Sequence, residues 1–132
     1  MLQQTQTSRV ETKFETWMQT FPDFESLANA PLAEVLKVWQ GLGYNRRAIA
    51  LQKCAQIVVK DYDGALPMDT HELVKLPHIG PNTAGSIAAF AFDQPTVFIE
   101  TNIRSVFIAF FFPHKKQVDD KSILELVEKT LD

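Results

Sequence analysis

The fold of this chain is decided by the stretch Leu73-Val74-Lys75-Leu76-Pro77-His78-Ile79-Gly80-Pro81-Asn82-Thr83-Ala84. A short apolar segment ends in a tight turn of Pro and Gly residues, and a second helical segment begins directly after the turn. Gly permits a positive φ and Pro fixes φ, so both residue types suit a sharp reversal of the backbone. The stretch therefore predicts a helix–hairpin–helix over residues 73–84.

Such a hairpin has a physical use in holding a phosphate group. Gly80 lets the backbone approach a ligand closely, and the amides of Gly80, Asn82 and Thr83 stand at the start of the second helix. Unpaired amides there point outward with the helix dipole behind them. A site of this kind binds the DNA backbone without reading base sequence. The alternative is a plain turn between two helices.

Helical periodicity continues outward from the hairpin in both directions. Apolar residues at Ala50, Cys54, Ile57 and Val58, and at Ile123, Leu126, Val127 and Leu131, lie on single helix faces. We expect an all-α protein with helices near residues 8–20, 31–39, 45–61, 69–75, 81–92, 101–111 and 119–131. No repeat or flexible linker divides the chain, so residues 1–132 are expected to form one domain. Neither end carries a helix cap or stop signal, so we expect truncation at both ends.

Composition excludes several other classes of protein. The 132 residues are 45% hydrophobic and 22% charged with a net charge of −3, as in one ordinary globular domain. The single cysteine, Cys54, excludes a disulfide framework and four-cysteine metal sites within this chain, and is expected to be buried. His71, His78 and His114 have no metal-ligand spacing and are expected on the surface or in turns.

The net charge hides an uneven distribution along the chain. Between Leu42 and Lys60 every charged residue is basic, whereas the last fourteen residues hold five acids and two lysines. Local patches decide whether a protein meets phosphate, so the first region is a candidate DNA surface and the tail is expected to face water.

An aromatic residue stands at the tip of a glycine-flanked loop in this basic region. The stretch reads Trp39-Gln40-Gly41-Leu42-Gly43-Tyr44-Asn45-Arg46-Arg47. An enzyme that acts on a base must extract it from the stack, and an inserted aromatic side chain offsets part of that cost. Tyr44 is therefore a candidate wedge, with Arg46 and Arg47 as candidate DNA contacts. The alternative is that Tyr44 packs on the core and both arginines are solvated.

Two further polar clusters are candidates for chemistry. Glu100 and Asn102 lie in an otherwise apolar run, where a carboxylate could stabilise positive charge that develops on a sugar ring. The alternative is that Glu100 only caps the following helix. Gln3, Gln4, Thr5 and Gln6 carry amides and a hydroxyl that can bond base edges, or they are a frayed polar terminus.

Four blocks of sequence then occur together. They are Met1-Leu2-Gln3-Gln4-Thr5-Gln6, Gly41-Leu42-Gly43-Tyr44, Leu76-Pro77-x-Ile79-Gly80-x-x-Thr83-Ala84-Gly85 and Glu100-x-Asn102-x-Arg104. In this order and spacing the chain closely resembles the adenine-specific (A/G mismatch) DNA glycosylases of the helix–hairpin–helix, endonuclease III-like superfamily. The resemblance covers nearly all of the chain.

The resemblance implies a six-helix barrel module of the helix–hairpin–helix glycosylase fold. It implies hydrolysis of the N-glycosidic bond of adenine mispaired with 8-oxoguanine or guanine, the first step of base-excision repair. The implied partner is double-stranded DNA with a mismatch or an oxidised guanine. No cofactor is expected within this chain, because the family's iron–sulfur cluster cysteines and C-terminal lesion-recognition domain are absent from it. We expect a cytoplasmic, nucleoid-associated monomer without a membrane partner.

The resemblance also assigns roles to individual residues. Gln3, Gln4 and Thr5 match residues near the lesion pair, and Tyr44 matches the intercalating tyrosine. Leu42 lies in the same loop and is expected to be a DNA contact as well. Glu100 falls on the catalytic aspartate and Asn102 on its companion asparagine. Asn82 falls where lyase members keep a Schiff-base lysine, so a monofunctional, water-using enzyme is implied.

Three departures from the family pattern bear on activity. The family's general acid lies two residues before the methionine that matches Met1, and its loss would remove roughly 10²–10⁴-fold of rate. Glu100 is one methylene longer than Asp, and His78 replaces the first glycine of the hairpin. These departures keep a second interpretation open, in which the chain is a catalytically impaired module that binds damaged or mismatched DNA.

Overall fold

The computed structural model describes residues 1–2, 5–115 and 117–130. Within these residues the chain is all-helical, without a strand, so the predicted all-α class is confirmed. The helices are α1 (Thr7–Thr20), α2 (Phe24–Asn29), α3 (Leu32–Trp39), α4 (Arg46–Asp61), α5 (Thr70–Leu73), α6 (Pro81–Phe92), α7 (Thr101–Phe111) and α8 (Asp120–Lys129).

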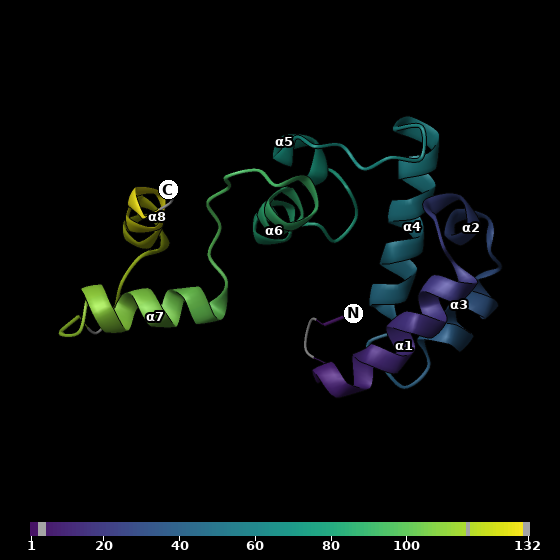
Figure 1. Cartoon of the computed structure of the whole chain (residues 1–132), viewed down its shortest axis with the longest axis horizontal. Coiled ribbons are helices and arrows are strands. Elements are labelled where there is room, and N and C mark those ends of the chain that lie inside the picture. Colours follow the sequence, from purple (N-terminus) through teal and green to yellow (C-terminus); the bar gives the residue numbers. More distant parts are fainter. Residues whose placement is uncertain (3–4, 116, 131–132) are drawn as a thin grey trace. The chain divides into compact units, whose positions relative to one another are not determined.

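Contacts group the chain into two compact units (Figure 1). Unit 1 comprises Met1–Pro67 with Lys75–His78 and contains α1 to α4, and unit 2 comprises Met68–Val74 with Ile79–Asp132 and contains α5 to α8. The expectation of a single domain over residues 1–132 stays a prediction. The described part of the chain has no helix long and apolar enough to cross a membrane.

The sequence prediction missed helix α2. Its N-cap, Asp23, accepts a hydrogen bond of 2.8 Å from the backbone N–H of Ser26, and the Ser26 hydroxyl accepts one of 3.3 Å from the Asp23 N–H. This reciprocal pair satisfies two amides that the first helical turn leaves unpaired. The bonds hold the pKa of Asp23 below its ordinary value. Because α2 has only six residues, its apolar periodicity is too short to detect.

Unit 1 is built on a core of buried aromatic and aliphatic side chains. Trp39 is 1% exposed, and its ring meets that of Trp17 edge to face at a centroid distance of 5.5 Å. Trp17 also meets Phe21 edge to face at 5.0 Å. Helix α4 contacts both α2 and α3, and small buried residues such as Ala48 and Ala55 let these helices approach it. This core fixes the junction between α3 and α4.

A buried glutamine ties α2 to α4. The Nε2 group of Gln52 donates to the backbone oxygens of Leu27 at 3.2 Å and Ala30 at 2.7 Å, at the end of α2. Both bonds satisfy carbonyls that the last helical turn leaves without partners, so the buried amide is compensated. Cys54 is buried on the same helix, as predicted, and burial raises the pKa of its thiol.

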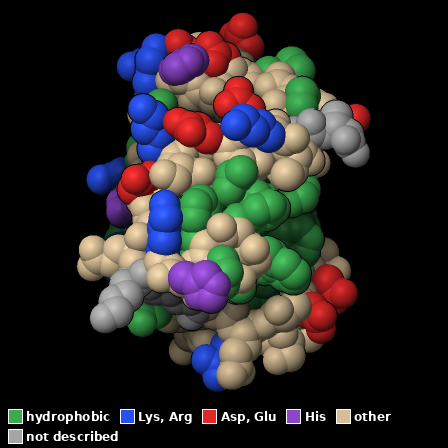
Figure 2. All heavy atoms as spheres, turned by 90° about the vertical axis from the view of Figure 1, so that its left-hand side faces the viewer, with side chains coloured by type: hydrophobic (Ala, Val, Ile, Leu, Met, Phe, Trp, Pro, Cys, Tyr) green, Lys and Arg blue, Asp and Glu red, His purple; other side chains and the backbone are tan. Residues whose placement is uncertain are grey.

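Unit 2 contains a smaller core between α7 and α8. Ile123 and Val127 of α8 are buried together with Ile99, which precedes α7. Helix α7 has no buried residue of its own, and Phe110 is 79% exposed. Figure 2 views the molecule from the side of α7 and α8 and shows hydrophobic side chains at the surface there. An ion pair between Arg104 and Asp120 joins the two helices.

Candidate nucleic-acid interface

The loop between α3 and α4 has a strained backbone and presents an aromatic ring. Gly41, Gly43 and Tyr44 have positive φ values of 93°, 72° and 48°. A left-handed conformation is costly for tyrosine, so other contacts must hold it in place. The Tyr44 side chain is 56% exposed, which excludes the alternative in which it packs on the core.

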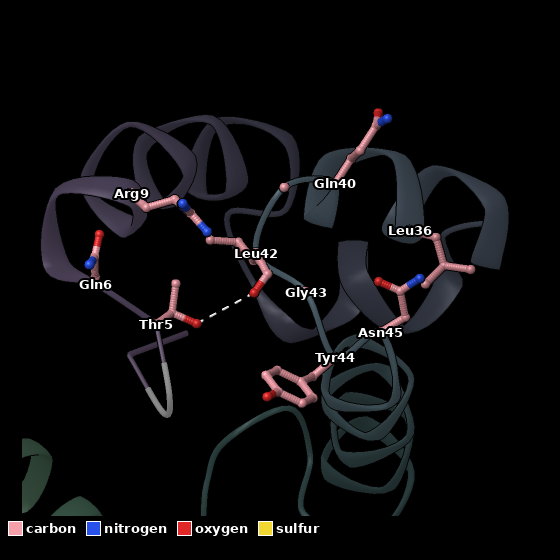
Figure 3. Close-up of a pocket in the computed structure, with 10 residues that line it drawn as sticks. Thr5, Gln6, Arg9, Leu36, Gln40, Leu42, Gly43, Tyr44 and Asn45 are labelled. Carbon is pink, nitrogen blue, oxygen red and sulfur yellow. Dashed lines mark hydrogen bonds between the residues drawn. The ribbon is translucent and has the colours of Figure 1, made fainter.

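A pocket of about 610 Å³ lies beside this loop. Figure 3 shows Thr5, Gln6 and Arg9 on one side of it, Leu36, Gln40 and Asn45 on the other, and Leu42, Gly43 and Tyr44 between them. The Gln6 side chain is exposed, and Gln6 is the N-cap of α1. The surroundings of Tyr44 therefore include hydroxyl, amide and guanidinium groups that can bond a polar ligand.

Two buried groups fix the base of the loop. The indole Nε1 of Trp39 donates to the Gly43 carbonyl at 2.9 Å, and the Leu42 side chain is 3% exposed within the unit 1 core. Leu42, which the resemblance placed among the DNA contacts, thus has its side chain inside the protein and its carbonyl toward Thr5. The Thr5 hydroxyl donates to that carbonyl at 3.4 Å. Gln3 and Gln4, which were predicted to lie near the lesion pair with Thr5, are outside the described residues.

The two adjacent arginines are placed differently. Arg46 is exposed at the start of α4. Arg47 is half-buried, and its guanidinium donates to oxygens of Met1, Thr5, Leu42 and Gly43. The side chain that the sequence offered as a second DNA contact is therefore engaged within unit 1.

The predicted hairpin joins α5 to α6. His78 has a φ of 60°, so its position does adopt the left-handed region that glycine favours. Gly80 has an ordinary φ of −89°, and a Cβ atom added there would meet nothing within 4 Å. Neither the backbone conformation nor internal packing of the described chain explains a glycine at this position.

The start of α6 is open to a ligand. Pro81 occupies its first turn, and no side chain caps its N-terminal amides. Asn82 is exposed and Thr83 half-buried, so the amides at the helix start lie at the surface. Amides in this position carry the positive end of the helix dipole and can accept an anion.

Glu100 caps α7, and both of its carboxylate oxygens accept hydrogen bonds. Its Oε1 accepts hydrogen bonds from the backbone N–H groups of Asn102 at 2.7 Å and Ile103 at 3.1 Å. Its Oε2 accepts from the side-chain Nδ2 of Asn102 at 3.4 Å. The two residues predicted to act together are thus in direct contact, and Asn102 orients the carboxylate.

The sequence as a whole matches the pattern of a known family. Residues 1–131 match the family described as HhH-GPD superfamily base excision DNA repair protein. The chain belongs to the HhH-GPD superfamily. The helix–hairpin–helix over residues 73–84 is thus part of a pattern that extends along the whole described chain.

Individual relatives of this HhH-GPD chain are adenine DNA glycosylases. This chain is 42% identical over 106 residues to an adenine DNA glycosylase of Mycolicibacterium smegmatis. The aligned stretch is 80% of this chain and 36% of the relative. The chain is 35% identical over 132 residues to one of Buchnera aphidicola, covering all of this chain and 37% of the relative. The predicted resemblance is confirmed. The chain spans little more than a third of the length of these two relatives.

Solved structures confirm the fold. A thermostable thymine-DNA glycosylase superposes with a TM-score of 0.89 at 24% identity, covering 97% of this chain and 60% of the other. A trapped endonuclease III–DNA covalent intermediate gives a TM-score of 0.78 at 24% identity over 97% of this chain and 58% of the other. The helix–hairpin–helix glycosylase fold predicted from the sequence is therefore that of this HhH-GPD chain.

The residues of the HhH-GPD chain do not fit an iron–sulfur cluster. Such clusters need several thiolates, whereas the single cysteine here is Cys54, a buried thiol on α4. Within the described ranges no three His, Cys, Asp or Glu side chains gather in a metal-binding arrangement, and His71, His78 and His114 are exposed, as predicted.

Sequence reasoning missed two residues of the Tyr44 site in this HhH-GPD chain. Arg9 of α1 lines the pocket, and Trp39 fixes the Gly43 carbonyl. The signal for Arg9 was its basic side chain in the first turn of α1, four residues after Thr5 in the sequence. For Trp39 no signal distinguished a buried indole that bonds the loop from one that only fills the core.

Proposed function

We propose that this chain is the helical part of a base-excision repair enzyme that removes adenine mispaired with 8-oxoguanine or guanine. Its partner in this proposal is double-stranded DNA that contains the mismatch, bound by a monomer. Adenine is proposed as the excised base because the bacterial relatives are adenine DNA glycosylases. An adenine DNA glycosylase of Homo sapiens, 42% identical over 107 residues, supports the same base. The proposed reaction uses water as its nucleophile, and we propose no cofactor within this chain.

One observation carries the proposal: Tyr44 is an exposed aromatic ring on a strained loop beside a polar pocket. Excision requires that the base leave the duplex stack, which costs a few kcal/mol. A ring inserted into the stack replaces part of the lost contact. Thr5, Gln6 and Arg9 then line a pocket in which the edge of a base next to the inserted ring can be hydrogen-bonded.

The open start of α6 supports binding of the DNA backbone. A phosphate placed there accepts hydrogen bonds from the surface amides of Asn82 and Thr83 and meets the positive end of the helix dipole. Gly80 provides space for that approach, since a Cβ at this position has no neighbour inside the chain. These contacts position the duplex and carry no base specificity.

Glu100 supports the chemical step. When the N-glycosidic bond breaks, its electron pair leaves with adenine and positive charge develops on the deoxyribose ring. A carboxylate held in a fixed orientation stabilises that charge without having to reorganise. Water then adds to the sugar carbon and gives up a proton to the solvent, while the departing adenine takes one proton from the solvent, so that a C–O bond replaces the broken C–N bond. The Asn102 amide, which donates to Glu100 Oε2, orients the carboxylate.

A second function is favoured by the same contacts of Glu100. Both of its oxygens already accept hydrogen bonds from the first turn of α7, as in an ordinary helix cap. If capping is the whole role of Glu100, the chain is a module that binds mismatched or damaged DNA without excising a base. The two functions predict the same complex and differ in the release of adenine.

A single-turnover assay separates the two functions. The folded chain, in excess over duplex with adenine opposite 8-oxoguanine, is followed for complex formation and base release together. Excision predicts release that Glu100→Gln lowers by about 10²–10³-fold with duplex affinity retained, because glutamine keeps a capping oxygen but loses the charge. Glu125→Gln, an exposed residue of α8, is the control for the same change of charge. Binding without release of adenine supports the DNA-binding module. If the chain neither binds the duplex nor releases adenine, both functions are refuted.

A further inference from the structure

Arg47 lies at the N-terminal end of a helix, where a positive charge is unfavourable, and oxygen atoms of the chain accept hydrogen bonds from its guanidinium. It lies in the first turn of α4, where the helix dipole is positive and no acidic residue compensates it. Its Nη1 donates to the Met1 carbonyl at 3.1 Å, and its Nη2 donates to the Thr5 hydroxyl and the Leu42 carbonyl at 3.0 Å each. A third acceptor of Nη2, the Gly43 carbonyl, lies at 3.3 Å.

The same guanidinium lies against two aromatic rings. Its Cζ atom is 5.4 Å from the centroid of Trp39 and 5.5 Å from that of Tyr44. Both distances are within the range of a cation–π contact. The backbone N–H of Arg47 also donates to the Tyr44 carbonyl at 2.9 Å. Arg47 thus contacts the candidate wedge through both its side chain and its backbone.

These contacts connect the distant N-terminal segment with the loop before α4 and with the core of unit 1. The N-terminal segment is up to 46 residues from Arg47, the loop precedes it directly, and Trp39 belongs to the core. A planar guanidinium can bond several oxygens while stacking on rings, which a lysine ammonium cannot do. The φ of 48° at Tyr44 needs such support, because tyrosine does not favour it in isolation.

We propose that Arg47 is a positioning residue that holds Tyr44 in its exposed, left-handed conformation and ties the loop to the N-terminal segment. Its guanidinium acts inside the protein, and the exposed Arg46 is the arginine that meets phosphate. The role deepens the proposed function, on which its consequence for DNA rests. Its consequence for the loop does not depend on DNA.

Hydrogen exchange in the absence of DNA tests the loop directly. Arg47→Ala and Arg47→Lys are each expected to raise amide exchange in residues 42–45 about tenfold, because the restraint on the loop is lost. Arg46→Ala removes the neighbouring charge and is expected to leave exchange unchanged. If Arg47→Lys keeps the exchange rates of the original chain, a point charge suffices and the proposal is overturned. Circular dichroism establishes that each variant is folded.

Duplex binding then tests the consequence for DNA. Arg47→Ala is expected to reduce the preference for lesion over intact duplex about tenfold. The double variant Arg47→Ala/Tyr44→Ala is expected to lose no more of this preference than Tyr44→Ala alone. The salt dependence of binding distinguishes the two arginines. Loss of one phosphate contact lowers the slope of log affinity against log salt concentration by about one. We expect this change for Arg46→Ala but not for Arg47→Ala. A lower slope for Arg47→Ala contradicts the positioning role. An original chain without lesion preference refutes the proposed function instead, while the exchange result still decides the role of Arg47.

Discussion

The Tyr44 loop and the Glu100 turn hold their side chains in opposite ways. Tyr44 depends on contacts from distant parts of unit 1, including the bond from Arg47 to the Met1 carbonyl across 46 residues. Glu100 depends on bonds to residues two and three positions away, all within the first turn of α7. The orientation of the first is tertiary and that of the second is local.

This difference predicts which changes will propagate. A local cap forms with its helix, so its loss affects mainly that helix. A loop held by a packed core moves when the core is damaged, even where the mutation is remote from the ring. The same contrast appears in packing, because unit 1 buries two tryptophans while α7 buries none of its own residues.

The largest effect is expected from Trp39→Ala in the unit 1 core. Removing this fully buried ring creates a cavity, cuts the contact with Trp17 and deletes the bond to the Gly43 carbonyl. We expect the free energy of unfolding, measured by denaturant titration, to fall by about 3–5 kcal/mol. Phe110→Ala on exposed α7 is the control and should change it by less than about 0.5 kcal/mol. Equal effects at both positions would erase the contrast between the two regions.

A smaller effect is expected from Gly85→Ala in α6. A Cβ at Gly85 would lie 2.8 Å from the Cβ of Phe98, an atom that cannot turn aside. Overpacking of this kind typically costs about 1–3 kcal/mol, more than the gain in helix propensity from alanine. Gly80→Ala, where a Cβ meets nothing, should leave thermal stability nearly unchanged but weaken duplex binding. A stable Gly85→Ala variant would show that Phe98 can move.

Loss of the Glu100 cap is expected to have a local effect. Glu100→Ala removes the acceptor for two backbone N–H groups, and we expect a loss of about 0.5–2 kcal/mol in denaturant titration. Glu100→Asp keeps an acceptor of a residue type that caps helices well, and should retain most of the stability. An alanine variant as stable as the original chain would show that the cap contributes little.

The smallest effect concerns acid stability at the start of α8. Asp119 accepts a bond of 2.6 Å from the Ser122 N–H, and bonds to Ser122 hold the pKa of this carboxyl below its ordinary value of 3.8. The stability it contributes is therefore present above pH 3.8 and lost as the pH falls through the lower, folded-state pKa. Asp119→Asn should make thermal stability less dependent on pH in that acid window. An unchanged acid profile would exclude Asp119 from this linkage.

Local signals allowed most of the fold to be predicted from the sequence. The Pro/Gly turn marked the hairpin, and apolar spacing located the longer helices. Helix α2 was not predicted, because its six residues do not complete two helical turns and are too few to show apolar periodicity. Its capping pair of Asp23 and Ser26 was the available signal.

The candidate site was predictable in its residue types and less so in its contacts. Tyr44 was found because it is an aromatic residue at the tip of a glycine-flanked loop within the basic region of the chain. The inward orientation of Arg47 could not be found, because it depends on carbonyl groups brought close by packing rather than by sequence. Adjacent arginines look equivalent in the sequence, and only the fold places one outside and one inside.

Duplex binding by Tyr44→Ala tests the central claim most directly. Affinities of the original chain and this variant are measured for duplex with adenine opposite 8-oxoguanine and for the matched intact duplex, over a range of salt. The wedge predicts that the variant loses about tenfold or more of its preference for the lesion while its salt slope is unchanged. Equal losses of affinity on both duplexes would contradict the wedge and the function built on it.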